Sequence, residues 1–434
     1  MSTHSGTMEF EKATYRKVTL RLIPFLILCF VIAYVDRVNV GFAKLEMQKD
    51  LGMSDAVYGI GAGIFFIGYF FFEVPSNIAL QRFGARRWIA PIMIIWGFIS
   101  SSTMFTGSAT YFYVVRFLLG LVEAGFFPGV ILYLTFWYSS KHRTKIVAVF
   151  MTAIALSGIA GGPISGWILS HMSGLHGLKG WQWLFLLEGF PPVIIGLSVY
   201  YLLDDSPGKA KWLTMDERNL LVRRLEEDEE IKNAQGYSHQ RLKDVFNNPT
   251  VWLFCLVYFG IVMGTYGIGF WLPQIIQDSL TKDYWRIGII SAIPWTFGAI
   301  TMIWNGQHSD MTGERRWHIS LAALVAFVAF AASGIPGISG SYAIIALSFA
   351  TAGVMSALSS FWALPTSILS GTAAAAGIAW INSIGNLAGY VSPYVVGEIR
   401  YRTHNMAYAL LVLSAFCLMS ALIVLYLTRK DQYR

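Results

Sequence analysis

The chain has 434 residues, of which 55% are hydrophobic and only 13% are Asp, Glu, Lys or Arg. Soluble domains carry about twice that fraction of charge, so the composition excludes a soluble enzyme, a disordered chain and a disulfide scaffold, and it leaves a polytopic helical membrane protein. The net charge of +7 does not indicate a nucleic-acid partner, because the basic residues fall in short clusters between apolar blocks, as topology determinants do.

Twelve apolar blocks are long enough to cross a bilayer as helices, which takes roughly 20 residues. The first block follows a polar tail and is too long for a cleaved signal sequence, so it is expected to be an uncleaved span. No segment alternates with a period of two over many repeats, which argues against barrel strands. The predicted spans are Val18–Phe42, Val57–Leu80, Trp88–Phe105, Tyr111–Trp137, Thr144–Ser170, Trp181–Leu203, Pro249–Leu272, Arg286–Asn305, Trp317–Gly334, Tyr342–Pro365, Thr372–Gly397 and Met406–Tyr426.

The longest polar stretch divides these spans into six and six. With the N-terminus inside, the inside segments carry 23 Lys and Arg and the outside segments carry 7, which is the bias that fixes orientation. Both termini are therefore expected to be cytoplasmic. The expected divisions are a cytoplasmic N-terminal tail (1–17), an N-terminal six-helix bundle (18–203), a cytoplasmic central loop (204–248), a C-terminal six-helix bundle (249–427) and a cytoplasmic C-terminal tail (428–434).

The two halves contain an internal repeat. NIALQRFGARRW (77–88) follows the second span and GQHSDMTGERRW (306–317) follows the eighth, at an offset of 229 residues. Each copy has Gly at its eighth position and ends in Arg-Arg-Trp. Two pseudo-symmetric halves of this kind are typical of a transporter whose substrate binds between them near the midplane.

Both loops resemble the cytoplasmic signature G-x-x-x-D-R-x-G-R-R of the major facilitator superfamily, which implies its twelve-helix fold. In that family the loop latches the inward-closed state through charge pairs to neighbouring helices. The first copy has Asn77 and Gln81 where Gly and Asp are usual, which weakens the expectation of a latch there. The second copy keeps Gly306, Asp310, Gly313, Arg315 and Arg316.

Glycine pairs four residues apart occur in spans 2, 5 and 11, at Gly59 and Gly63, Gly162 and Gly166, and Gly385 and Gly389. Such spacing allows helix backbones to approach closely in lipid. Ordinary packing between helices that do not move is one explanation of this glycine spacing. The resemblance implies more, because in the superfamily spans 2, 5, 8 and 11 line the interface at which the halves rock.

An ionised side chain in a span costs several kcal/mol, so the charged residues Asp36, Arg37, Glu73, Arg116, Glu123 and Glu188 in the first six spans call for an explanation. Asp36 and Arg37 are adjacent, so they point about 100° apart and cannot pair well with each other. Arg116 and Glu123 are seven residues apart on one face of span 4, a separation of roughly 10 Å. We expect the two cations and two carboxylates to converge in one cavity as a coupled anion and proton site; the alternative is a neutral structural network.

The chemistry suits that expectation. A guanidinium binds a carboxylate bidentately and keeps its proton, whereas the proton affinity of a carboxylate responds to burial and to a nearby arginine. An anionic substrate that draws an arginine away from Asp36 or Glu123 would favour protonation of that carboxylate. This exchange is a physical mechanism for symport.

A closer resemblance appears in YVDRVNVGFA (34–43) and RFLLGLVEAGFFPG (116–129), and in segments over nearly the whole chain. They are similar to the anion:cation symporter family, which includes bacterial permeases for tartrate, 4-hydroxyphenylacetate and phthalate, and this implies an inner-membrane location. The resemblance implies that Asp36 and Glu123 couple protons. It implies that substrate is bound by Arg37, Arg116, Tyr34, Tyr69, Trp362, Asn382 and Asn386.

Residue patterns alone say less about the C-terminal half. Asn382 and Asn386 form one polar stripe that must face protein or cavity rather than lipid, and substrate hydroxyls or interhelical hydrogen bonds explain it equally well. Trp362 precedes Pro365, where span 10 should end or kink, and core packing accounts for it as readily as substrate contact. Glu73 and Glu188 are expected to be structural.

The leading hypothesis is a proton-coupled importer of a small organic carboxylate that works as a monomer, with protons and the lipid bilayer as its other partners. A tartrate-like hydroxy acid or a sugar acid is favoured, and an aromatic acid is the alternative. Scattered cysteines and histidines give no metal or disulfide pattern, and no cofactor is expected. A drug or organic-cation exporter predicts acidic residues without matched arginines. A membrane enzyme needs a His/Asp/Ser or metal cluster, and a nutrient sensor usually carries an added soluble domain.

Overall fold

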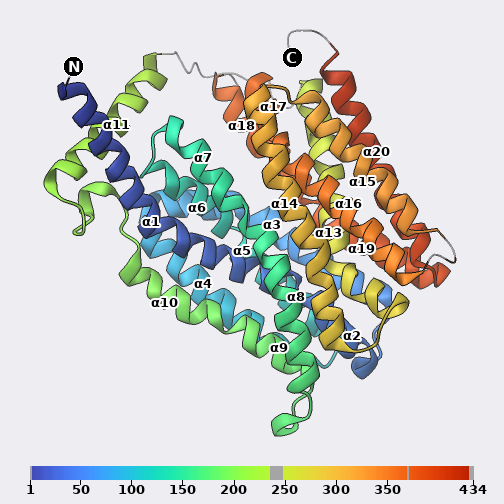
Figure 1. Ribbon diagram of the computed structural model, residues 1–434. Coiled ribbons are helices and arrows are strands. Elements are labelled where there is room, and N and C mark those ends of the chain that lie inside the picture. The colour runs from blue at the N-terminus through green and yellow to red at the C-terminus, as the bar shows by residue number, and fades with distance from the viewer. Residues whose placement is uncertain (1, 235–247, 336, 338, 369–370, 430–434) are drawn as a thin grey trace.

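The protein is all-helical over the residues described by its computed structural model, which are 2–234, 248–335, 337, 339–368 and 371–429 (Figure 1). The first half contains α1 (Ser2–Val38), α2 (Val40–Leu51), α3 (Asp55–Phe83), α4 (Ala85–Ser102), α5 (Ala109–Glu123), α6 (Phe126–Thr135), α7 (Ser140–Met151), α8 (Ala153–His171), α9 (Gly180–Gly189) and α10 (Pro191–Leu202). The second half contains α13 (Pro249–Ser279), α14 (Tyr284–Thr312), α15 (Arg316–Ser333), α16 (Gly340–Phe361), α17 (Ala363–Ile368), α18 (Gly371–Asn386), α19 (Ala388–Thr403) and α20 (Met406–Leu427). Between the halves lies α11 (Met215–Ala234).

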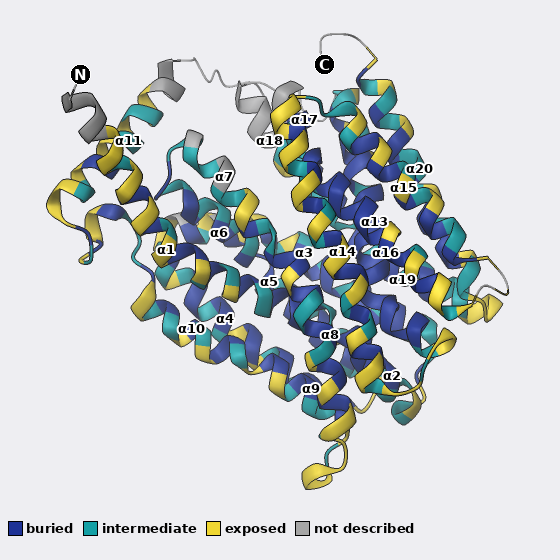
Figure 2. Ribbon diagram, in the orientation of Figure 1, coloured by how far each residue is buried: buried dark blue, intermediate teal, exposed yellow. Residues whose placement is uncertain are grey.

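The predicted membrane-spanning fold is confirmed. Eleven stretches of described helix are long and apolar enough to cross a bilayer, and each falls on a predicted span. The remaining prediction, 372–397, falls on α18 and α19, which have 16 residues each and follow one another across Leu387. Large hydrophobic side chains also cover the outer surface, as lipid-facing helices require; Phe71, Ile300, Val328 and Leu422 are among the exposed ones (Figure 2).

Several spans are interrupted, and proline explains three of the interruptions. A proline ring clashes with the carbonyl four residues earlier and lacks the N–H that would bond to it. Pro128 therefore breaks the helix at Ala124, the residue that follows the end of α5 at Glu123, and Pro365 ends α16 at Phe361. Pro191 begins α10 in the same way. The expected end of span 10 before Pro365 is thus confirmed.

The start of α1 and the end of α20 lie at one end of the molecule, which we call the terminal end, and α2 and α9 lie toward the other, the distal end (Figure 1). The predicted tail is not separate from the first span, because α1 begins at Ser2 and Tyr15 within it is already buried. The predicted central loop contains α11, and its residues 235–247 lie outside the described part of the chain.

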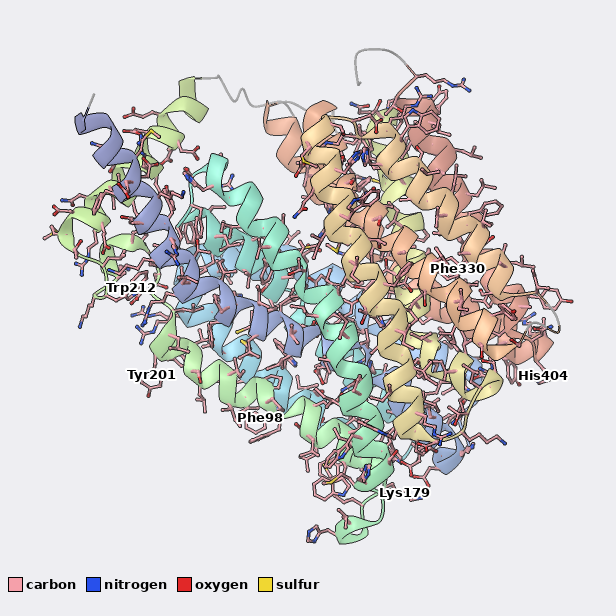
Figure 3. All side chains as sticks on the ribbon, in the orientation of Figure 1. Phe98, Lys179, Tyr201, Trp212, Phe330 and His404 are labelled. Carbon is pink, nitrogen blue, oxygen red and sulfur yellow. The ribbon has the colours of Figure 1, made fainter. Side chains whose placement is uncertain are left out.

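The helix α11 packs against the terminal end of the first half. Lys17 of α1 donates to Glu217 at 2.7 Å, and Arg224 donates to Glu11 at 2.6 Å. Burial is the largest single influence on the pKa of Glu217 and would raise it, but the hydrogen bonds from Lys17 and Thr214 and the charge of Lys17 together outweigh burial, and the pKa is lowered. Just before this helix, the ring of Trp212 (labelled in Figure 3) stacks on Trp137 with ring centroids 5.8 Å apart. The linker is therefore held to the first half.

The two signature loops share a backbone feature that the repeat predicts. Gly84 and Gly313, the eighth residues of the two copies, have φ angles of +86° and +68°, a conformation that favours glycine. In the second copy Asp310 pairs with Arg315 of its own loop at 2.7 Å. The side chains of Asn77 and Gln81, on which the first copy departs from the signature, lie outside the described ones.

The halves are in close contact where the paired glycines lie. A Cβ at Gly162 of α8 would be 2.7 Å from the carbonyl oxygen of Gly288 on α14, and one at Gly59 of α3 would be 2.5 Å from that of Pro393 on α19. These separations are too short for any side chain. The glycine pairs thus join one half to the other, whereas at the terminal end α7 and α17 are well separated (Figure 1).

Candidate functional site

The predicted site residues gather where helices are interrupted. Asp36 and Arg37 precede the break between α1 and α2, and Glu123 precedes the break between α5 and α6. Trp362 lies between α16 and α17, and Asn386 ends α18. Interrupted helices free backbone groups and often form substrate sites in transporters. The sequence singled out these residues by charge or resemblance; the structure places them at irregular backbone.

Arg37 pairs with Glu123 inside the first half and also reaches the second half. Its Nε donates to Glu123 Oε1 at 3.0 Å, and Nη2 forms a second, shorter bond to the same oxygen. Its Nη1 donates to the hydroxyl of Tyr266 on α13 at 3.2 Å. Glu123 is fully buried, and its Oε2 has no hydrogen-bond partner among the described residues. The guanidinium thus connects a carboxylate of one half with a hydroxyl of the other.

Arg116 contacts the backbone of α1 beside the Arg37–Glu123 pair. Its Nη2 donates to the backbone carbonyl of Arg37 at 3.2 Å, one of the last carbonyls of α1. Its guanidinium lies 5.1 Å from the centre of the Phe65 ring, and its Nε has no partner among the described residues. Arg116 is 1% exposed. A buried cation without a carboxylate partner keeps positive charge available beside Arg37.

The side chain of Asp36 points toward α4. Trp96 Nε1 and Ser100 Oγ, both on α4, donate to its carboxylate, the first at 2.9 Å. Asn39 Nδ2 contributes a third bond at 3.3 Å. Asp36, which is expected to converge with the other three charges in one cavity, takes its hydrogen bonds from α4 because adjacent helix residues diverge, and its carboxylate still acts electrostatically on Arg116. It is fully buried within the first half.

An aromatic wall surrounds Arg37. The centres of the Phe65 and Tyr69 rings lie 5.2 and 5.3 Å from its guanidinium carbon, and that of the Tyr34 ring lies 6.0 Å away. The Tyr34 hydroxyl has no partner among the described residues. Rings at these distances stabilise a guanidinium through cation–π contact. The structure thus brings predicted Tyr34 and Tyr69 together with Arg37.

The second half adds a wall of its own. Tyr258 of α13 stacks on Phe361 at 5.1 Å and lies 4.9 Å from the Trp362 ring. Asn382 Nδ2 donates to Glu73 Oε1 of the first half at 2.9 Å. Asn386, one turn further along α18, is half-buried. Asn382 therefore lies at the boundary between the halves, whereas Trp362 packs on Tyr258 and Phe361 within the second half.

Sequence reasoning overlooked three groups in this region. Lys44 lies beyond the predicted first span and is one of the seven Lys and Arg assigned to the outside segments, yet it is fully buried, 2.8 Å from Asp55 and 4.0 Å from the centre of the Trp271 ring. Glu73 was expected to be structural, and Tyr266 was one aromatic residue among many. The continuation of helix after Asn39 in an amphipathic segment could have indicated the burial of Lys44; nothing local indicated the cross-half contacts of Glu73 and Tyr266.

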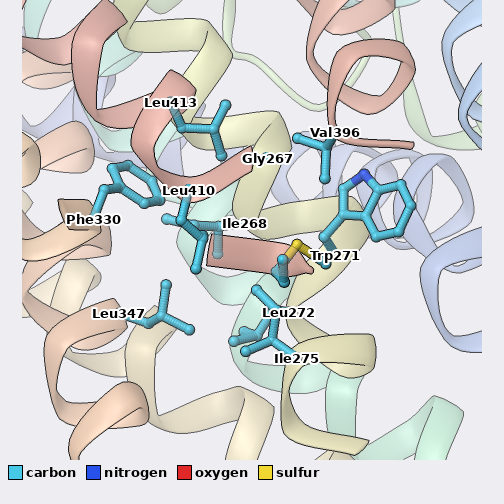
Figure 4. A pocket seen from close by; sticks show the side chains of 11 residues that line it. Gly267, Ile268, Trp271, Leu272, Ile275, Phe330, Leu347, Val396, Leu410 and Leu413 are labelled. Atoms are coloured by element: carbon cyan, nitrogen blue, oxygen red, sulfur yellow. The ribbon is translucent and has the colours of Figure 1, made fainter. Parts of the chain in front are cut away.

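Two pockets lie near this region. One is enclosed by apolar side chains of the second half, among them Ile268, Phe330 and Leu413 (Figure 4), and it offers no charged group to an anion. The other lies between the halves, where α1 and α8 face α13 and α14, and its polar lining residues are Asn39, Ser157, Ser165 and Ser291. Asn39, which lines the second pocket, also donates a hydrogen bond to the Asp36 carboxylate.

Comparison with known proteins agrees with this architecture. A relative from Agrobacterium vitis, provisionally named a tartrate transporter, is 46% identical over 97% of this chain and 96% of its own length. A quinolone resistance transporter from Acinetobacter baumannii is 40% identical over 94% of this chain and 93% of its own. The crystal structure of a D-xylose–proton symporter superposes with a TM-score of 0.74 at 16% identity, covering 93% of this chain and 97% of that one.

The family follows from a separate match. The sequence profile of the Major Facilitator Superfamily matches residues 26–393, which include both halves and every predicted site residue. Its members are membrane transporters rather than enzymes, and the relatives above carry transporter names over nearly the full chain. This chain therefore belongs to the major facilitator superfamily, and it is a membrane transporter.

Proposed function

We propose that the protein is a proton-coupled symporter that imports a small hydroxylated organic carboxylate, tartrate-like or a sugar acid, by alternating access. The observation that carries this proposal is the contact of one guanidinium, Arg37, with Glu123 in its own half and Tyr266 in the other. A substrate carboxylate has the geometry to replace Glu123 on that guanidinium. The name of the Agrobacterium vitis relative supports a carboxylate of this class.

The coupling step follows from charge balance. When a substrate carboxylate binds Arg37, Glu123 loses its counter-ion in a buried position, and an unpaired buried carboxylate takes up a proton rather than remain charged. Arg116 then supplies the second positive charge beside the bound anion. Release of substrate restores the Arg37–Glu123 pair and returns the proton. Asp36, held by Trp96 and Ser100, relays this same proton to and from Glu123.

The orientation belongs to the same proposal. Both termini and the central loop are cytoplasmic in the inner membrane, the two bundles are residues 18–203 and 249–427, and the monomer is the transporting unit. The terminal end then faces the cytoplasm. The close glycine contacts between the halves lie on the extracytoplasmic side of the site, so the conformation described here is the inward-facing one.

Uptake into proteoliposomes with an imposed pH gradient tests the function. Wild-type protein is expected to accumulate a labelled hydroxy acid from a panel of carboxylates when the outside is acidic. Asp36→Asn should abolish accumulation driven by the gradient, because the isosteric amide keeps the packing against Trp96 but cannot carry a proton. Equal accumulation with and without the gradient in the wild type would rule out proton coupling.

An aromatic carboxylate is the second candidate substrate. The rings of Tyr34, Tyr69, Tyr258 and Trp362 around the site favour it, and quinolones, the drugs in the name of the Acinetobacter baumannii relative, carry a carboxyl group on an aromatic ring. Competition distinguishes the two classes. Excess 4-hydroxyphenylacetate should leave tartrate uptake unchanged if the substrate is a hydroxy acid and should block it if the site accepts aromatic acids.

A further inference from the structure

Glu73 makes a contact between the halves that the proton-coupling scheme does not use. It lies on α3, is 7% exposed, and accepts a hydrogen bond from Asn382 Nδ2 of α18 at 2.9 Å. Ser383 of the same helix also lies beside the carboxyl group. Its other oxygen, Oε2, is buried and has no hydrogen-bond partner among the described residues. A buried acceptor is thus left open at the boundary between the halves.

Among the described residues, no cation forms an ion pair with the buried carboxyl group of Glu73. The charge that acts on it is Arg37, which is already paired with Glu123. A carboxylate inside a membrane protein is costly unless it is paired, so an unpaired one indicates a function. If the hydrogen bond with Asn382 had only a structural role, a neutral glutamine at this position would make it equally well.

The position of Glu73 relative to Arg37 fits a site with two ends. Tyr69, whose ring centre lies 5.3 Å from the Arg37 guanidinium carbon, is one helical turn before Glu73 on the same face of α3. One turn of four residues advances about 6 Å along the helix axis. Tyr258 and Trp362 of the second half lie beside the far end. An elongated acid a few carbons long could extend from Arg37 to Glu73.

We propose that Glu73 and Asn382 form a subsite that binds a hydroxyl group of the substrate, so that Glu73 is a specificity-determining residue for hydroxylated acids. This inference rests on the proposed function, because it assumes that the substrate carboxylate binds Arg37. A carboxylate accepts hydrogen bonds and an amide both donates and accepts. A substrate hydroxyl donates to Glu73 Oε2 and accepts from Asn382, which satisfies all three groups.

The subsite discriminates between hydroxylated acids and acids without hydroxyls, because an acid that leaves the subsite empty loses binding free energy. An acid that lacks the hydroxyl would displace water from Glu73 and Asn382 without replacing its hydrogen bonds. Leaving buried hydrogen-bonding groups without partners costs enough for about a tenfold or greater difference in affinity. The hydroxylated acid should therefore bind at least tenfold more tightly than the matched acid without hydroxyls.

Binding to the full-length protein in lipid nanodiscs tests this with two matched pairs. Tartrate and succinate have four carbons and two carboxyl groups and differ in hydroxyls, and gluconate and hexanoate differ in the same way with six carbons and one carboxyl group. For the pair whose hydroxylated member binds the wild type, the ratio of dissociation constants should be about ten or more. Glu73→Ala and Asn382→Ala should bring it toward one, and Glu73→Gln, which keeps an acceptor, should give an intermediate value.

Glu188→Ala is the matched control. Glu188 is another buried glutamate of the first half, but its partner is Ser165 of that half, at 2.7 Å, so its loss should leave the ratio unchanged. A ratio unaltered in both Glu73→Ala and Asn382→Ala would overturn the subsite while leaving the proposed transport intact. A wild-type ratio near one in both pairs would do the same. No binding or gradient-driven uptake of any carboxylate would instead refute the proposed function itself.

Discussion

Asp36 and Arg37 are adjacent in sequence, yet their side chains lie in different surroundings. Asp36 is enclosed by α4 within the first half, whereas Arg37 points to α5 and to α13 of the second half. The divergence follows from the 100° turn between successive helix residues. Of these two residues, Arg37 is the one that contacts both halves. It is therefore placed to exchange Glu123 for a substrate carboxylate as the halves move.

Replacing Arg37 by lysine tests the need for the guanidinium. Arg37→Lys retains the charge but cannot bind Glu123 through two nitrogens while donating to Tyr266, because an ammonium lacks the planar fork. We expect gradient-driven uptake to fall about tenfold or more, measured in proteoliposomes. Arg286→Lys, a change at a side chain that is 73% exposed, should leave uptake unaltered; a wild-type rate in Arg37→Lys would show that charge alone suffices.

The residues that make up the site could be predicted from the sequence better than the hydrogen bonds and ion pairs between them. An ionised residue in an apolar block is visible locally, which is why Arg37, Arg116 and Glu123 could be singled out. The hydrogen-bond partners of Asp36 could not be predicted, because Trp96 and Ser100 carry no signal in the sequence and lie 60 and 64 residues away. The contact of Asn382 with Glu73 joins positions 309 residues apart, and only the packing of the two halves creates it.

At the scale of helices, the glycine pairs decide how closely the halves approach. Gly162 and Gly166 on α8 lie against Gly288 and the backbone of Tyr284 on α14. In lipid, helices associate through such close backbone packing, because the hydrophobic effect does not favour contact between helices over contact with lipid. The spacing of these glycines was readable from the sequence; which helix they contact was not, since it depends on the arrangement of the two bundles.

A single methyl group should disturb this contact. Gly162→Ala places a Cβ 2.7 Å from the Gly288 carbonyl oxygen, an overlap that costs about 1–3 kcal/mol, so the conformation with this contact becomes less populated. In a Ser291→Cys background, labelling by a membrane-impermeant maleimide added outside should accelerate about fivefold or more. The native cysteines are buried and give low background.

Gly107→Ala provides the control, because a Cβ there meets no atom within 4 Å. Its labelling rate should equal that of Ser291→Cys alone. Unchanged labelling in Gly162→Ala would mean that the α8–α14 contact does not set the balance between conformations.

Across the whole molecule, polar contacts join the halves from the site toward the distal end. Arg400 of α19 bridges Asp55 of the first half at 3.2 Å and Asp278 of its own at 2.8 Å. Lys44 donates to Gln274 at 3.0 Å, and Arg37 donates to Tyr266. Arg37 is thus one member of a chain of contacts that must break for the halves to rock. Binding at Arg37 therefore acts on the conformational equilibrium of the entire protein.

The general architecture was predictable because a bilayer imposes local requirements. Each span needs a run of apolar residues, and the duplicated loops reveal two halves. The interruptions at Pro128 and Pro365 also follow from local chemistry. The helical start of α1 within the predicted tail and the burial of Lys44 did not follow, because both depend on contacts with helices distant in sequence.

The central claim is that Glu123 takes up a proton when a substrate carboxylate replaces it on Arg37. Proton movement into proteoliposomes, followed with an enclosed pH dye as a transported carboxylate is added outside, tests it most directly in Glu123→Gln. The account predicts that this variant still exchanges labelled for unlabelled substrate but moves no protons with it. Substrate-dependent acidification of the interior at the wild-type rate in Glu123→Gln would contradict the account.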